Sequence, residues 1–319
     1  MEILTTTLGQ MFVLFALIFI GFFLTKIKIM TSESATILSR LENNLLLPAL
    51  VMSTFVENFT IKTIESAWKI LLISTAIGII MILLAILVSK CCSKDKFIQN
   101  IFTYGLSFSN FGFMGNAVVK AVFPDIFMEY LIFTLPLWTI IYLWAVPTLL
   151  IPAEGGKQTL RTRLKSFANP MFGGMLLGMI IGLCSIPMPA PVTNLLKVTG
   201  DCMSPIAMIL TGITVARMDF KKIMSMANIY IVSLVRLIVF PLIFIGVFFL
   251  MKSYTSIPLS DTIVVCTIAS LAMPLGLSPI IIPSAYGKDT SVAAGATLAS
   301  HALSCLTIPV MFYLLQMIL

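Results

Sequence analysis

The chain has 319 residues, of which 59% are hydrophobic and only 10% are charged, and its mean hydropathy is +1.07. A soluble domain cannot carry so few charged side chains, so this composition excludes a soluble globular protein and predicts an all-α integral membrane protein. The net charge of +7 lies mainly in the links between apolar runs, and no nucleic-acid-binding motif accompanies it. We therefore expect membrane lipid, and no nucleic acid, among its partners.

Apolar runs long enough to span a bilayer recur along the chain and predict ten transmembrane helices. In chain order, their expected cores are residues 6–25, 36–55, 68–89, 98–119, 127–149, 171–186, 192–215, 229–251, 263–286 and 293–315. The first run lacks a basic leader and a small-residue cleavage site, so we expect a helix there and not a signal peptide.

Lysine and arginine are shared unevenly between the two sets of links that these helices would make. Placing the amino terminus outside puts thirteen basic residues in cytoplasmic links and four in the others. The cytoplasmic set is Lys26, Lys28, Lys90, Lys94, Lys96, Lys157, Arg161, Arg163, Lys165, Arg217, Lys221, Lys222 and Lys288. Because basic residues are retained on the cytoplasmic side, we predict a multi-pass protein of the cell (plasma) membrane with both termini extracytoplasmic.

The longest basic link, residues 152–168, divides the chain into two halves of equal length, 1–151 and 169–319. Each half would hold five helices, and an odd number makes the second half enter the membrane from the opposite face. Equal halves of odd helix count are what two inverted five-helix repeats require. The other interpretation is a coincidence of length.

The ninth predicted helix contains Pro274, Pro279 and Pro283, with Gly276 near its centre. Each proline inside a helix removes a hydrogen bond and costs about 3 kcal/mol. Irregular backbone at membrane depth is tolerated only where protein or a water-filled cavity surrounds it. One proline would indicate a packing kink, but three predict a broken helix that borders a site.

The fourth predicted helix carries two amides and two glycines at mid-span, Asn110, Gly112, Gly115 and Asn116. The glycines alone could serve close helix packing, but their place opposite the proline-rich helix favours a second break. Two broken helices that cross present free N–H groups and positive dipole ends, which favour an anion such as a small carboxylate. Their exposed carbonyl groups can hold a cation or water.

Four stretches of the sequence resemble the auxin efflux carrier family, whose bacterial members include proteins assigned to malate and malonate transport. They are LSRLENNLLLPALVMSTF, SNFGFMGNAV, GDCMSPIAMILTGITVAR and AMPLGLSPIIIPSAYGKDTSVAAGATLASHALSCLTIPV, and the resemblance covers essentially the whole chain. It implies ten helices in two inverted repeats with crossing helices four and nine, an architecture similar to the bile acid sodium symporters. It also implies substrate binding at that crossing and alternating access of the elevator type.

By this resemblance, Asn110, Gly112 and Gly115 match the helix-four motif of the family and Pro274 matches the proline of helix nine. The chain departs from the family at Asn116, where proline is common nearby. It departs again where helix nine commonly has asparagine and this chain has serine followed by proline. The expected substrate-binding set is Asn110, Gly112, Gly115, Asn116, Pro274, Gly276, Ser278 and Pro279.

Ionisable residues inside the predicted spans are costly in a bilayer and are therefore paired or functional. Arg236 is expected to have a carboxylate or the substrate as its charge partner. Lys197 and Asp201 are four residues apart, so they share one helical face and are expected to pair there.

Three residues are candidates for ion or proton coupling: His301, Glu42 and Asp201. His301 is the only histidine, and it suits either proton coupling or a neutral hydrogen bond between helices. Glu42 is the other candidate for a proton carrier, or it pairs with Arg40 or another base near the cytoplasmic end of its helix.

The sequence gives little support to an enzyme. It has no HExxH, GxSxG or P-loop motif, one histidine cannot build a histidine-rich metal site, and its six cysteines show no metal or disulfide spacing. We expect no enzyme, no metal and no cofactor, with coupling to H+ or Na+ left open.

The favoured function is a secondary active transporter of small organic anions such as dicarboxylates, and the direction of transport stays open. One alternative is a sodium-coupled symporter of bile-acid-type or other amphipathic solutes. Another is a non-transporting membrane sensor or a channel. The resemblance also suggests a homodimer.

Overall fold

The computed structural model describes residues 2–151, 170–254, 260–317 and 319, so the predicted linker 152–168 lies outside the described residues. In these ranges the regular structure is helical, apart from one isolated β-bridge. Five helical stretches of the described chain are long and apolar enough to cross a membrane: Ala67–Cys92, Pro124–Leu150, Ala190–Arg217, Ala227–Tyr254 and Ser291–Gln316. The prediction of an all-helical membrane protein is confirmed.

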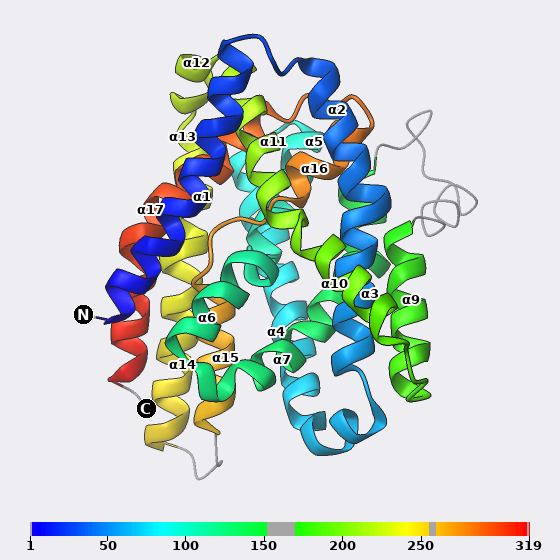
Figure 1. Cartoon of the computed structure of the whole chain (residues 1–319). Helices are drawn as coiled ribbons and strands as arrows, with labels where there is room; N and C mark the ends of the chain where they lie inside the picture. Colours follow the sequence, from blue (N-terminus) through cyan, green and yellow to red (C-terminus); the bar gives the residue numbers. More distant parts are fainter. Residues whose placement is uncertain (1, 152–169, 255–259, 318) are drawn as a thin grey trace.

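The described part of the first half of the chain forms seven α-helices and four other helical segments, of which three are π-helical and one is a 3-10 helix (Figure 1). Thr31 and Ser34 exchange hydrogen bonds as a capping box at the start of the second helix, and Asp95 caps the fifth. In order, the elements are α1 (Glu2–Lys26), α2 (Ser32–Leu41), η1 (Glu42–Leu46), α3 (Leu47–Asn58), α4 (Ile61–Cys92), α5 (Lys96–Ser107), η2 (Phe111–Gly115), α6 (Asn116–Val122), η3 (Pro124–Ile126), α7 (Phe127–Ile140) and η4 (Ile141–Leu150).

The described part of the second half is built in the same manner. Its elements are α9 (Pro170–Leu183), α10 (Ala190–Asp201), α11 (Met203–Arg217), α12 (Phe220–Met224), α13 (Ala227–Leu234), the π-helical η5 (Val235–Val239), α14 (Phe240–Tyr254), α15 (Asp261–Leu271), α16 (Ser278–Ala285) and α17 (Ser291–Gln316). The ten predicted apolar runs fall mainly on these elements, and the fourth and ninth runs each contain a non-helical segment, residues 108–110 and 272–277.

Helices from the two halves pack closely through glycine. α1 packs along α11, and α3 packs along α9 and α10. A Cβ atom at Gly21 would collide with the backbone of α11, and one at Gly212 would collide with the backbone of α1. Three glycines of α9, spaced by four residues, meet the backbone of α3 in the same way: Gly174, Gly178 and Gly182. Small residues at such seams let helices approach closely, which is a main source of attraction between helices in lipid.

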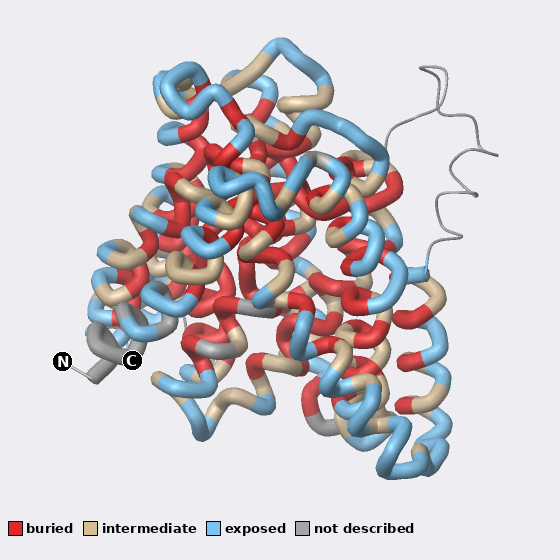
Figure 2. The backbone as a smooth tube through the Cα atoms, turned by 45° about the horizontal axis from the view of Figure 1, so that its top comes forward, coloured by how far each residue is buried: buried red, intermediate tan, exposed pale blue. Residues whose placement is uncertain are grey.

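The remaining helices surround the centre of the molecule, where α4 packs against α5 and α7, and α13 against α17. Buried residues concentrate in the interior and exposed residues lie mostly on the outside (Figure 2). Many exposed side chains are large and apolar, for example Phe12, Leu83 and Leu306. In water such a surface would aggregate, but the acyl chains of a bilayer cover it without cost.

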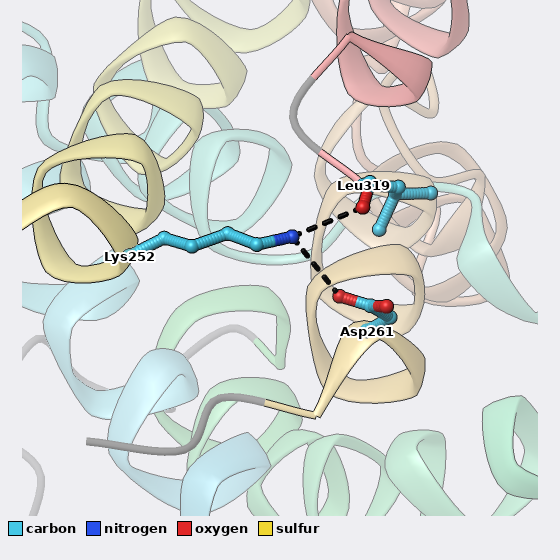
Figure 3. Close-up of polar contacts among 3 residues, drawn as sticks. All are labelled: Lys252, Asp261 and Leu319. Carbon is cyan, nitrogen blue, oxygen red and sulfur yellow. Dashed lines mark hydrogen bonds and ion pairs between the residues drawn. The ribbon is translucent and has the colours of Figure 1, made fainter. Parts of the chain in front are cut away.

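The connections between helices lie at two opposite ends. The α1–α2 connection, α12 and the α16–α17 connection are at the top of Figure 1, and the α3–α4 connection and the start of α15 are at the other end. At that other end, Lys252 Nζ lies 3.5 Å from Asp261 Oδ1 and donates to the carbonyl of Leu319 at 3.0 Å (Figure 3). These contacts join the end of α14 to the start of α15 and to the segment after α17.

Candidate functional site

Two helices are interrupted in the interior of the molecule. Residues 108–110 separate α5 from η2, and residues 272–277 separate α15 from α16. Pro274 lies in the second gap, where no helical hydrogen bond is required of it. Pro279 lies in the first turn of α16, a position at which a helix needs no N–H donor. The second gap is visible as the coil that links α15 to α16 in Figure 1.

The two non-helical segments, residues 108–110 and 272–277, pair with each other, and we call the place where they meet the crossing. Ser109 and Leu275 form an antiparallel bridge, and the N–H of Asn110 donates to the carbonyl of Pro274 at 2.7 Å. The N–H of Leu275 donates to Ser300 Oγ on α17 at 3.2 Å. Buried backbone groups that a helix no longer satisfies need other partners, and these bonds supply them.

Carbonyl groups at the ends of α5 and α15 are bound by Arg236, which lies in η5. Its Nη1 donates to Leu106 O at 2.8 Å, its Nη2 to Ser270 O at 3.2 Å, and its Nε lies 3.5 Å from Met273 O. The side chain is 1% exposed, and no carboxylate of the described chain lies within 4 Å of it. The expected carboxylate partner is absent from this part of the chain, because backbone carbonyls occupy the guanidinium.

His301 on α17 and Asn110 form a hydrogen-bonded pair beside the crossing. His301 Nδ1 lies 2.8 Å from Thr297 O, and because a carbonyl only accepts, Nδ1 carries the proton. Nε2 of the neutral ring then accepts from Asn110 Nδ2 at 3.2 Å. Asn110 Oδ1 is left buried and has no hydrogen-bond partner among the described residues. The crossing therefore contains an unused hydrogen-bond acceptor.

The predicted glycines make close approaches within the protein. A Cβ atom at Gly112 would collide with the indole of Trp138, and one at Gly115 with the hydroxyl of Tyr130, both on α7. At Gly276 a Cβ would lie 3.3 Å from the carbonyl oxygens of residues 108 and 109. These glycines allow the crossing and its contact with α7. Their part in ligand binding stays a prediction.

Asn116 begins α6 and Ser278 begins α16, one on each interrupted helix. Both side chains are half-buried, and Asn116 Oδ1 has no hydrogen-bond partner in the described ranges. The predicted substrate-binding residues thus lie on the two helices whose gaps meet. They come from segments more than 150 residues apart in the sequence.

Glu42 lies in η1 and is completely buried, and neither of its carboxyl oxygens has a hydrogen-bond partner among the described residues. Arg40 is exposed, so the expected pair with Glu42 does not form. Ser39 and Asn43 flank Glu42, and both donate to the carbonyl of Ile281 on α16. The helix that carries Glu42 is thereby attached to the second interrupted helix.

Asp201 ends α10, which packs on α3 and η1 and not on either interrupted helix. Its side chain and that of Lys197 are exposed, and no ion pair joins them in the described structure. The expected local pair is wrong. Exposed pairs four residues apart gain only about 0.3–0.5 kcal/mol, which is too little to fix two mobile side chains.

A cavity of about 530 Å³ opens at the end of the molecule that holds the basic connections. It lies between α2, the end of α11 and the α16–α17 connection, and it is lined by Arg217 and Lys288. Asp219 and Asp289 also line it, but each accepts from a backbone N–H group in the turn that follows. The two cations form no ion pair in the described part of the chain.

The chain also matches a known protein family. A family described as membrane transport protein matches residues 6–312 of the chain. This chain belongs to the auxin efflux carrier family of membrane transport proteins. It is therefore a multi-pass membrane transporter, and the resemblance expected from the sequence is confirmed. A search of curated proteins found no match.

Sequence reasoning missed several polar residues that support the crossing in this family member. Each stands next to a residue that the sequence singled out: Ser109 precedes Asn110, Ser300 precedes His301, and Asn43 follows Glu42. The signal that could have found them is a small polar residue next to an amide, histidine or carboxylate side chain within an apolar run.

Proposed function

We propose that the protein is a secondary active transporter of small organic anions such as dicarboxylates, and that the substrate binds where the two interrupted helices cross. The observation that carries this proposal is the crossing itself, with its bond from Asn110 N–H to Pro274 O. In secondary transporters, discontinuous helices of this kind form the binding site near the membrane midplane. The starts of η2 and α16 are helix amino ends, which favour a carboxylate.

The architecture we propose is ten transmembrane helices in two inverted five-helix repeats, residues 1–151 and 169–319, with broken crossing helices four and nine. Matching contacts support it. The first helix of one half packs on the second helix of the other, since α1 lies along α11 while α3 lies along α9. The gaps at 108–110 and 272–277 also occupy corresponding places in the two halves.

We place the end with α12 and the α1–α2 connection on the cytoplasmic side of the cell membrane, because the excess of basic residues lies in these connections. The cavity beside Arg217 and Lys288 would then face the cytoplasm and provide the route for an anion. Between this cavity and the crossing, Ser39 and Asn43 bind Ile281. In an elevator movement these bonds would break as the interrupted helices move past α2.

The unpaired Asn110 Oδ1 would make the site prefer dicarboxylates that carry a hydroxyl group. An acceptor cannot bind a carboxylate oxygen, but it can receive a hydroxyl group. A 2-hydroxy dicarboxylate such as malate offers both a carboxylate for the helix ends and a hydroxyl for Asn110. We expect malate to bind about tenfold more tightly than succinate, which lacks the hydroxyl, since one such hydrogen bond contributes roughly 1.4 kcal/mol.

The test is a thermal-shift screen of the purified protein with malate, malonate, succinate, other dicarboxylates, indole acids and bile acids, followed by counterflow in vesicles with any acid that stabilises it. Asn110→Ala should lower the affinity for malate to that for succinate while the protein stays monodisperse. Asn44→Ala is the matched control, because Asn44 is exposed and its amide only binds the carbonyl of Arg40.

Several outcomes would count against the proposal. Stabilisation by none of the acids would contradict anion binding, and unchanged malate affinity in Asn110→Ala would move the site elsewhere. Saturable binding without counterflow would indicate a sensor, and a flux too fast for alternating access would indicate a channel.

We propose that transport is coupled to protons through Glu42 or His301. A carboxylate is very costly to bury in ionised form without a partner, so Glu42 can hold a proton in this position and release it only where water reaches it. At least one of Glu42→Gln and His301→Gln should abolish malate uptake driven by a pH gradient while leaving counterflow intact. Unchanged pH dependence in both variants would remove this coupling.

A further inference from the structure

Arg236 is a buried cation that carries no counter-charge from a carboxylate of the described chain. Its three hydrogen-bond acceptors are backbone carbonyls, two in the last turns of interrupted helices and one in the gap that follows α15. Leu106 lies in the last turn of α5, Ser270 in the last turn of α15, and Met273 in the gap that follows.

Two helix carboxyl ends that point at one place create a negative site. The carbonyls of the last turn have no helical donors, and each helix end is equivalent to roughly half a negative charge. Two such ends together approach one unit, which the single positive charge of Arg236 balances. This balance explains how the guanidinium is buried without a carboxylate.

The surroundings of Arg236 contain the ligands that a small cation prefers. A small cavity beside it is lined mostly by apolar residues, but four of its lining residues carry hydroxyl groups: Ser107, Ser109, Thr267 and Ser270. Ser107 Oγ is buried and has no partner among the described residues. Hard cations are bound by oxygen ligands, and in transporters with broken helices, unwound carbonyls and helix carboxyl ends bind the coupling Na+.

We infer that Arg236 is a tethered substitute for a coupling cation: its guanidinium occupies the position that Na+ would take between the ends of α5 and α15. The crossing is then held together permanently by the protein's own charge, and the carrier requires neither Na+ nor K+ for binding. This inference rests on the proposed carrier function and separates it from a sodium-coupled symporter, in which an empty cation site must be filled first.

The first experiment uses the unmodified protein. Its melting temperature, with and without malate, is measured in NaCl and in N-methyl-D-glucamine chloride of equal ionic strength. We expect the same melting temperature and the same malate shift in both salts. A malate shift that disappears when Na+ is replaced would overturn the inference.

The second experiment removes the tethered cation. Arg236→Ala removes the guanidinium donors from the buried carbonyls of Leu106 and Met273, and it leaves the carbonyl of Ser270 with Ser109 as its side-chain donor. We therefore expect the melting temperature to fall by about 10 °C. Methylguanidinium has the donors of the deleted group, and it should restore at least half of this fall. Choline at the same concentration is too large for the site and should restore none.

Arg40→Ala is the control for a general effect of methylguanidinium, because Arg40 is exposed and its guanidinium has no ion pair in the described structure. Methylguanidinium should not change its melting temperature. If it stabilises Arg236→Ala no more than Arg40→Ala, the inference is wrong. The restored melting temperature is measured without any substrate. If methylguanidinium fails to restore it, the transport proposal still stands. If malate fails to bind, the methylguanidinium result can still be interpreted.

Should Arg236→Ala yield no folded protein, Arg236→Lys decides the matter. Lysine keeps a tethered charge but offers one small ammonium group in place of the planar fork. We expect it to melt below the unmodified protein and to remain indifferent to Na+. Stabilisation of this variant by Na+ over N-methyl-D-glucamine would show that the charge of residue 236 does not fill the cation position.

Discussion

The α1–α11 seam and the helix crossing join the two halves of the chain in opposite ways. At the seam, Gly21 and Gly212 remove side chains so that two regular helices touch backbone to backbone. At the crossing, residues 108–110 and 272–277 give up their helical hydrogen bonds and depend on Ser300 and Arg236 for new ones. Since glycine packing already brings helices together in this molecule, the polar crossing is not needed for adhesion. Its cost in a membrane argues for a role in binding.

The largest expected loss of stability comes from a substitution at the α1–α11 seam. Gly212→Ala places a Cβ atom against the backbone of α1, and backbone cannot move aside as a side chain can. We expect a loss of about 3 kcal/mol in stability, seen as a lower melting temperature in detergent. Gly246→Ala is the matched control, because nothing lies within 4 Å of its added Cβ. It should be neutral or stabilising by up to about 1 kcal/mol, and equal melting temperatures for the two variants would contradict the seam.

The next effect probes the crossing through two serines. Ser300→Ala leaves the N–H of Leu275 buried without a partner, which should cost about 2 kcal/mol. Ser109→Ala removes one donor to the carbonyl of Ser270, but Arg236 still donates to that carbonyl. We therefore expect Ser300→Ala to melt lower than Ser109→Ala. The reverse order would mean that the crossing does not rely on α17.

A smaller effect concerns the cavity and the proposed anion. Replacing Arg217 and Lys288 by glutamine should weaken malate binding about threefold at low salt, and the difference should vanish at high salt as exposed charges are screened. Lys221→Gln is the control, because this lysine lies at the same end but does not line the cavity. A difference that persists at high salt would place these residues in direct contact with the substrate.

The smallest expected effect lies at the opposite end. Lys252 and Asp261 form an ion pair whose side chains are 53% and 64% exposed, and such pairs contribute about half a kcal/mol. Lys252→Ala should therefore change the melting temperature by less than about 3 °C. A larger fall would mean that the contacts among α14, α15 and Leu319 hold the fold together.

Much of the fold could be predicted because its causes are local in the sequence. Twenty-residue apolar runs predict helices, and the cluster around Asn110 and the prolines from Pro274 onward mark disturbed backbone inside such runs. These two clusters lie in the helices that meet at the crossing, so the sequence alone pointed to the right helices. The prolines were expected to leave carbonyls without donors, and the structure supplies donors from Ser109 and Arg236 to Ser270.

The partners of charged side chains could not be predicted in this way. The sequence predicts a carboxylate or the substrate as the partner of Arg236, but its acceptors in the described structure are backbone carbonyls. Every residue has such a carbonyl, and no sequence pattern marks the ones that will be used. Lys197 and Asp201 have the spacing of a helical pair, yet spacing permits an exposed pair without enforcing it. The close contact of Gly112 with Trp138 is a tertiary contact between η2 and α7, and it depends on how the whole chain folds.

The hydrogen bond from the N–H of Asn110 to the carbonyl of Pro274 uses only main-chain atoms, so it can survive changes of side chain during evolution. The acceptor carbonyl persists whatever residue is encoded at position 274, and the donor N–H persists for every residue at position 110 except proline. Neighbouring positions such as Asn116 and Ser278 are then free to change without unmaking the junction. Under the proposed function, a few substitutions beside the crossing could change the substrate while the membrane architecture is inherited unaltered.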